Sequence, residues 1–357
     1  MLKRLFFIFA VIAVFVSCHN KLEVLAPYKE SVAVYGLLNQ DDSVNYIRIE
    51  RVYLGEGNAI QMAGIQDSVW FKPGELKVSL QRIRNGALVS VDNPATAVKE
   101  IVLTEQYITT DSGVFNKNQL AYRTNHKLYE DSQYQLLIHN NRTGKDFSAP
   151  AVGLVGDFAS KMIYTQENSI INPSYQNVNV VAQGGKTICT FQAPLNAGVC
   201  GLKMLFYYTD YTFANVITPR LLTVDLGTQY TMNTDGTDKI DLSFSDDGML
   251  EYFINHIGVD ANIHHRTADS VKFVVNGAAY DLALYNQVSN TTTLAQTKPY
   301  YSNINGGVGI FSARRQYIIK KRLSNSCVDR LAKAHSSCSL FPLRFYLSAG
   351  GFPVCDP

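Results

Sequence analysis

The sequence predicts a mainly β protein with two β-rich units, and three observations support this prediction. Short segments rich in Val, Ile and Tyr recur along the chain, separated by Gly, Asn and Pro residues. Few stretches show the apolar spacing of a helix. The length of 357 residues allows about two domains, each able to bury its own core.

The first unit is predicted to be an immunoglobulin-like β-sandwich over residues 31–155. Asn85-Gly86 predicts a two-residue hairpin turn, because the positive φ angles of such a turn suit Asn and Gly, and a second hairpin is expected to turn at 140–144. Short strands without helices between them favour a sandwich. The strands expected in this unit are residues 31–38, 43–53, 76–84, 87–91, 134–139 and 145–149.

The second unit, residues 160–357, is predicted to be larger and β-dominated, with two or three short helices. Its clearest helix is 246–257. Ser245 can cap the N-terminus, acidic residues fill the first turn, and Gly258 follows an apolar stripe. The other expected elements are helices at 278–288 and 327–334 and strands at 187–192, 201–208, 272–275 and 309–319.

Residues 1–17 have the plan of a lipoprotein signal peptide. Lys3 and Arg4 precede an unbroken run of 12 apolar residues, 5–16. Such a run rises only about 18 Å as a helix, which is too short for a hydrocarbon core of about 30 Å. We therefore expect a cleaved signal and not a spanning helix.

Cys18 follows the apolar run and predicts a covalent lipid. Ser17-Cys18 resembles the lipobox of bacterial lipoproteins, in which the acylated cysteine becomes the new N-terminus, although Phe15 stands where that motif prefers Leu. The alternative is an ordinary signal peptide with an incidental cysteine. Each buried CH₂ of the acyl chains contributes about 0.8 kcal/mol, so we expect residues 18–30 to be a lipidated tether with an effectively permanent anchor.

The charge balance excludes nucleic acid as a partner. Only 17% of the residues are charged, compared with about 25% in a typical soluble domain. The signal peptide carries two of the 32 basic residues and none of the 30 acidic residues, so the mature chain is formally neutral. A neutral chain lacks the electrostatic attraction that dominates binding to DNA and RNA.

Five cysteines lie beyond the tether, and export to an oxidising compartment allows disulfides. Cys189 and Cys200 flank an expected strand–loop–strand, which predicts a disulfide between them. Cys327 and Cys338 form the second candidate pair, and Cys355 competes as a partner for either pair. An odd number leaves at least one thiol outside these pairs. No C-x-x-C occurs, so neither a thioredoxin-like site nor a zinc ribbon is predicted.

No catalytic motif is present, and we predict neither an enzyme nor a cofactor other than the lipid. The sequence has no nucleophile elbow, no H-E-x-x-H, no P-loop and no dinucleotide glycine pattern. His256, His264 and His265 are weak candidates for a metal site, with a solvated loop as the alternative; the adjacent pair is expected to point apart on a strand. Asp235 and Asp238 are weak candidates for calcium, but Asp is also an ordinary hairpin residue.

A cluster of five positive charges near the end of the chain is a candidate partner-binding site. It flanks residues 316–319 and would suit phosphorylated sugars or an acidic protein surface. The alternative is a solvated strand edge, where cations discourage pairing with other strands. The cluster consists of Arg314, Arg315, Lys320, Lys321 and Arg322.

The 21 tyrosines raise a sugar-binding hypothesis, because aromatic rings stack on sugar faces. Most of these tyrosines fall in strand-like segments. Packing in the core and at interfaces is therefore the default expectation for them.

Several stretches spread over the mature chain together carry a resemblance to one protein family. They are residues 32–39, 46–49, 54–59, 134–138, 143–145 and 279–282, and the most specific is 301–311, which contains Ser-Asn-Ile-x-Gly-Gly-x-Gly-Ile-Phe. Together they resemble a family of Bacteroidota outer-envelope lipoproteins known only as a domain of unknown function. The resemblance implies a lipid-anchored, β-rich, two-part protein, often encoded near outer-membrane transport proteins. It supplies no catalytic residues, and the end of the chain, 348–355, matches it only loosely.

We therefore expect a lipid-anchored outer-membrane lipoprotein, a non-enzymatic accessory or binding subunit of a β-barrel complex for transport, secretion or assembly. Its partners would be that barrel, the barrel's other lipoproteins and the membrane. The resemblance favours the cell surface over the periplasmic face, although Glu23 is the only acid just after Cys18, where surface lipoproteins of this phylum usually carry an acidic run. The alternatives are a surface lipoprotein that binds glycan, peptide or metal, and an enzyme whose residues meet only in the fold.

Overall fold

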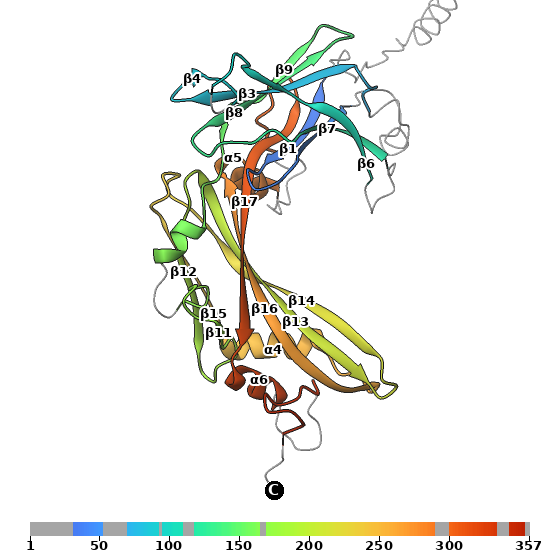
Figure 1. Ribbon diagram of the computed structural model, residues 1–357, viewed down its shortest axis with the longest axis vertical. Coiled ribbons are helices and arrows are strands. Elements are labelled where there is room, and N and C mark those ends of the chain that lie inside the picture. Colours follow the sequence, from blue (N-terminus) through green and yellow to red (C-terminus); the bar gives the residue numbers. More distant parts are fainter. Residues whose placement is uncertain are drawn as a thin grey trace, which may run out of the picture.

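The computed structural model describes residues 31–52, 70–92, 95–109, 118–164, 169–289, 300–333 and 343–353. These residues are mainly β, as predicted, and form 17 strands in sheets of nine, six and two strands. The molecule is elongated, with a broad head at one end and a stem of long strands leading to the other (Figure 1). The expected signal peptide, the tether, and Cys18, Cys338 and Cys355 lie outside the described residues, so the lipid anchor stays a prediction.

The head consists of strands β1 to β10 and packs two sheets around one core. In β1 and β2 buried side chains alternate with more exposed ones, and Val34, Ile47 and Ile49 lie on the buried face. They belong to the same hydrophobic core as the buried faces of β3 and β8. The head strands are β1 (Val32–Leu38), β2 (Asn45–Arg51), β3 (Leu76–Arg84), β4 (Ala87–Leu88), β5 (Glu100–Val102), β6 (Thr104–Thr109), β7 (Asn118–Thr124), β8 (Gln133–Asn140), β9 (Asp146–Ser148) and β10 (Val152–Gly153).

The stem consists of β13, β14, β16 and the second half of β17, which together continue one sheet of the head. This sheet has the order β14-β13-β16-β17-β1-β2-β7-β6, with β11 also beside β17. The 16 residues of β17 span roughly 50 Å. The strands after the head, with one 3-10 helix, are η1 (Ala159–Tyr164), β11 (Asn177–Val178), β12 (Lys186–Gln192), β13 (Ala197–Thr212), β14 (Ile217–Tyr230), β15 (Lys239–Ser245), β16 (Ile263–Ala279) and β17 (Val308–Leu323).

β17 belongs to both parts of the molecule. The predicted boundary at 155–160 covers the connection after β10 and the first residues of η1. The first residues of β17 nevertheless return to the head and pair in parallel with β1, with Val308 opposite Ala33. Further along, β17 pairs antiparallel with β16 in the stem. One continuous strand therefore joins head and stem (Figure 1).

The three helices expected from the sequence are present. Ser245 caps α4 by accepting a hydrogen bond from the backbone N–H of Gly248 at 3.2 Å, and Gly258 ends the helix with φ +70°. Among the described residues, no helix has both the length and the hydropathy to cross a membrane. The helices are α4 (Asp246–Ile257), α5 (Tyr280–Ser289) and α6 (Asn325–Ala332).

The predicted Cys189–Cys200 disulfide is wrong. The short connection between β12 and β13 leads the chain from one sheet into another instead of closing a hairpin. β12 pairs with β15, where Cys189 lies opposite Leu242, whereas Cys200 on β13 lies opposite Gly277 of β16. Both cysteines are buried free thiols. Cys327 on α6 is a buried free thiol as well, and the partners expected for it lie outside the described residues.

The glycine-rich motif at 301–311 leads into β17 and supplies its first four residues. The side-chain amide of Asn303 donates to the carbonyl of Phe311 at 2.7 Å and accepts from the backbone N–H of Phe311 at 2.9 Å. Gly309 has φ +109°, and a Cβ atom at this position would overlap the carbonyl oxygen of Val34. The glycine therefore permits the close parallel pairing of β17 with β1.

Candidate functional site

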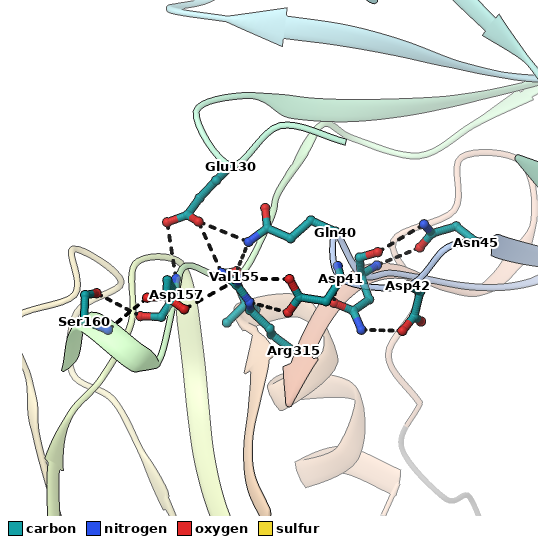
Figure 2. Close-up of polar contacts among 10 residues, drawn as sticks. Gln40, Asp41, Asp42, Asn45, Glu130, Val155, Asp157, Ser160 and Arg315 are labelled. Atoms are coloured by element: carbon teal, nitrogen blue, oxygen red, sulfur yellow. Dashed lines mark hydrogen bonds and ion pairs between the residues drawn. The ribbon is translucent and has the colours of Figure 1, made fainter. Parts of the chain in front are cut away.

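Arg315 of β17 lies at the centre of an acidic cluster where the head meets the stem (Figure 2). Its side chain is 13% exposed. Nε and Nη2 donate to the two carboxylate oxygens of Asp41 at 2.7 and 3.0 Å, and Nη1 donates to Oε2 of Glu130 at 3.2 Å. Asp157 Oδ1 lies 3.6 Å from Nη2. One guanidinium therefore binds acids from three separate segments, which we call the Arg315 cluster.

The turn between β1 and β2 presents Asp41 to Arg315. The backbone N–H of Asn39 donates to Oδ1 of Asn45 at 2.7 Å, and the Asn45 side-chain amide donates back to the carbonyl of Asn39 at 3.1 Å. The Asn39 side chain also donates to Oδ1 of Asp42 at 2.8 Å. The two bonds between Asn39 and Asn45 hold the turn closed (Figure 2), the turn also binds the Asp42 carboxylate, and Arg315 binds the Asp41 carboxylate.

The electrostatics of the cluster favour its ionised state. Burial alone raises the pKa of Asp157, but hydrogen bonds from the backbone N–H groups of Ser160 and Ala159, with the charge of Arg315, hold it below its usual value. Burial lowers the pKa of Arg315, whereas the surrounding carboxylates raise it, and the net shift is upward. Paired charges that stay ionised are suited to fastening two parts of a molecule together.

The structure does not bring the five predicted partner-binding cations into one patch. Arg314 and Arg315 lie roughly 17–26 Å along β17 from the other three. Lys321 is 5% exposed and donates to the carbonyl of Asn172 at 2.6 Å. Neighbouring side chains of a strand alternate in direction. Arg315 and Lys321 therefore point towards hydrogen-bond partners in the protein, and the exposed cations are Arg314, Lys320 and Arg322.

Beside the Arg315 cluster, two exposed tyrosines line a hollow of about 380 Å³ on the outer face of β1, β2 and β7. Tyr35 and Tyr46 are 45% and 38% exposed, so these two do not pack in the core as expected for the tyrosines. Ala121 of β7 lies opposite Arg48 of β2. Its short side chain lines the hollow between longer side chains such as those of Tyr46 and Arg48. Arg314 also lines the hollow. We call this the tyrosine hollow.

A second hollow, of about 540 Å³, lies on the six-stranded sheet of the head. Two close polar contacts line it: the ion pair of Lys77 with Glu100 at 3.3 Å, and Nδ1 of His139 at 2.6 Å from Oδ1 of Asp146. Asn305 of the glycine-rich motif forms part of its wall. Its polar side chains are therefore paired with one another, and no tyrosine is among the described residues that line it.

The histidine candidates lie on β16 and α4, not in a solvated loop. The expectation that His264 and His265 point apart is wrong, because their Nδ1 atoms are 2.8 Å apart next to a register irregularity of β13 and β16. His265 is stacked between Tyr211 and Tyr346, with ring centroids 4.3 and 3.9 Å away. His256 stacks on its own helix neighbour Tyr252. No group of three or more metal-ligating side chains gathers in the described part of the chain.

The two aspartates considered for calcium organise their own loop. Oδ1 of Asp235 accepts from the backbone N–H and the hydroxyl of Thr237 at 3.0 and 2.7 Å. Asp238 accepts from the backbone N–H groups of Met232 and Asn233. These bonds are those of a polar turn, which was the alternative to calcium.

Exposed apolar side chains gather at the far end of the stem. Phe213, in the turn between β13 and β14, is 62% exposed. Its ring centroid lies 5.1 Å from that of His264, and the ring centroid of Phe352 lies 6.1 Å from that of His264. The adjoining Val216 and Ile217 are 54% and 62% exposed. Val259, which follows α4, is 69% exposed. We call these five residues the apolar tip.

The hollow and the tip were not predicted, although the sequence holds a signal for the first. In β2 the polar residues Tyr46, Arg48 and Glu50 alternate with Ile47 and Ile49, which marks Tyr46 as outward-facing. The depth of the hollow depends on Ala121, a residue of another strand. No local pattern shows that pairing.

The comparisons with known proteins do not place this chain in a family. No protein-family model matches the sequence, and no curated protein matches it. One solved structure found by fold comparison is the C-terminal globular domain of an oligosaccharyltransferase from Pyrococcus abyssi, with 9% identity and a TM-score of 0.22. The match covers 83% of this chain and 50% of that one, so the chain spans half the length of that structure. A likeness of this size carries no argument about function.

Proposed function

We propose that this protein is a lipid-anchored outer-membrane lipoprotein that serves as a non-enzymatic accessory or binding subunit of an outer-membrane β-barrel complex. The observation that carries the proposal is the apolar tip, which lies at the opposite end of the molecule from the start of β1. Lone exposed apolar residues are ordinary on a protein surface, but a group of them at one end is typical of a contact surface.

The direction of the chain supports an anchor at one end and a contact surface at the other. The expected tether, residues 18–30, directly precedes β1. β1 begins beside the first residues of β17, and β17 then runs the length of the stem towards α6 (Figure 1). A lipid on Cys18 would therefore attach the molecule to the membrane through the head, and the tip lies roughly 50 Å along the molecule from that end.

The Arg315 cluster supports the same proposal, because it ties the anchored end to the contact end. The β1–β2 turn follows the first strand after the tether, and it binds the strand that forms the stem. A subunit that must hold a partner at a set distance from its anchor requires such a fixed joint.

Mild detergent extraction of the full-length protein from its own cells tests the proposal. The wild-type protein should co-purify with an outer-membrane β-barrel protein. The double variant Phe213→Ser, Ile217→Ser should lose about tenfold or more of that barrel, because the loss of two apolar anchors removes the centre of the contact. Mass spectrometry of the co-purified proteins and of the processed N-terminus, where acylated Cys18 is expected, provides the readout.

The matched control is Val98→Ser, Val102→Ser, which changes two comparably exposed apolar residues, 51% and 55% exposed, in the head. It should keep the barrel at the wild-type level. Extraction of the wild-type protein as a lone monomer, or equal loss in the two double variants, would refute the role of the tip. An unacylated N-terminus would refute the anchor.

A further inference from the structure

We propose that the tyrosine hollow binds a short acidic oligosaccharide, with uronic-acid rings lying on Tyr35 and Tyr46 and their carboxylates on Arg48 and Arg314. This site is in the head, away from the apolar tip, and it does not depend on the proposed role as a barrel subunit. Its ligand class follows from the arrangement of two exposed rings, two guanidinium groups and one carboxylate around a shallow floor.

The rings lie on one face of two neighbouring strands. Tyr35 of β1 is opposite Arg48 of β2, and Tyr46 is two residues before Arg48, so all three side chains project from the same side of the sheet. The Arg48 guanidinium lies 5.9 Å from the centre of the Tyr35 ring. Exposed tyrosines flanking a low floor at Ala121 offer flat apolar surfaces with hydroxyl groups at their edges.

The guanidinium groups are only weakly committed to partners in the protein. Arg314 is 45% exposed, and its Nη2 is 3.8 Å from Asp42, which is longer than a hydrogen bond. Arg48 is 43% exposed, pairs with Glu50 at 3.0 Å on the surface, and donates from Nη1 to Oε1 of Gln119 at 3.4 Å, which is long for a hydrogen bond. Exposed ion pairs of this kind contribute only about 0–1 kcal/mol, so a ligand carboxylate can compete for both guanidinium groups.

The remaining chemistry favours a sugar over a simple anion. An inorganic anion would use the two arginines but leave the rings without a partner. A uronic acid offers a face of C–H groups to a tyrosine, a carboxylate to an arginine, and hydroxyl groups that can donate to Asp42. The volume of about 380 Å³ is near the lower end of the range for ligand pockets, about 300–1,000 Å³, which suits a short chain of rings.

Isothermal titration of the full chain in mild detergent with trigalacturonic acid tests the site. Saturable binding is expected, and the fully methyl-esterified trimer should bind about tenfold or more weakly because it has lost its charge. The variants Tyr35→Ala, Tyr46→Ala and Arg314→Gln should each weaken binding of the acid by about tenfold. Lys320→Gln, which removes an exposed cation elsewhere on β17, should leave the affinity unchanged.

Sodium sulfate is the second probe, and unchanged melting temperatures of the variants show that they fold. Failure of trigalacturonic acid to saturate at millimolar concentration overturns the proposal. So does binding that survives both tyrosine variants, or sulfate competing as well as the sugar, because either result describes a general anion site. These outcomes are independent of barrel co-purification, which depends on the apolar tip.

Discussion

At the scale of single residues, burial decides the chemistry of the cysteines. Burial raises the pKa of the Cys200 thiol to about 12, and burial, with a smaller contribution from Asp241, raises the pKa of Cys189 further. The reactive species is the thiolate, so a rise of this size lowers its population at pH 8 by about a thousandfold. The structure therefore predicts two thiols that are inert while the protein is folded.

A pulse of iodoacetamide followed by peptide mass spectrometry checks this prediction. In the native protein at pH 8, Cys189 and Cys200 should remain unlabelled over a period in which both are fully alkylated in concentrated urea. A peptide linking Cys189 to Cys200 in a non-reduced digest, or rapid labelling of either in the native state, would contradict the assignment of free buried thiols.

At the scale of elements, the parallel pair of β1 and β17 depends on one glycine. Gly309→Ala should lower the free energy of unfolding by about 2–5 kcal/mol, because the new methyl group meets both an unfavourable φ of +109° and the carbonyl oxygen of Val34. The matched control is Gly86→Ala in the β3–β4 turn, where φ is +74° and nothing lies within 4 Å of the added Cβ.

Gly86→Ala should lower the free energy of unfolding only by the penalty for a positive φ, about 1–2 kcal/mol. Urea unfolding of the two variants measures the difference, which isolates the contact between strands. Equal midpoints would show that close approach of β1 and β17 at Gly309 is not needed for stability.

At the scale of the whole molecule, the Arg315 cluster fixes the head on the stem. Arg315→Gln should destabilise the protein by about 1–3 kcal/mol, because it removes charge-assisted bonds to Asp41 and Glu130 and leaves three carboxylates together. Arg314→Gln, one residue away but exposed, should change stability by less than about 0.5 kcal/mol. Similar urea midpoints for the two variants would contradict this role.

The same cluster predicts an acid dependence of stability. The pKa of Asp157 is depressed in the folded state, so its contribution is fully present above its unfolded pKa and is lost as the pH falls through the folded value. Wild-type stability should therefore fall below about pH 4, and it should fall less in Arg315→Gln, which lacks part of the interaction. Thermal unfolding of both proteins between neutral and acidic pH measures this difference.

Local patterns by themselves determined the mainly β class, the capped helix α4 and the Asn85-Gly86 turn. Asn85 and Gly86 have φ angles of 51° and 74°, as that turn requires. These features depend on interactions between residues a few positions apart, so a short stretch of sequence is enough to predict them. The lengths of β13, β16 and β17 were underestimated, because their stem portions alternate with polar residues that long-range pairing stabilises.

Only the tertiary structure decided which strands meet and which charges find partners. β12 pairs with β15 and not with β13, which removes the expected disulfide. Arg315 binds Asp41, 274 residues away, so a cation predicted to face a partner is neutralised within the chain. Strand pairing and burial arise from contacts between segments that are distant in the sequence, and neither segment alone determines the free energy of such a contact. For that reason the Arg315 cluster, the tyrosine hollow and the apolar tip exist only in the fold.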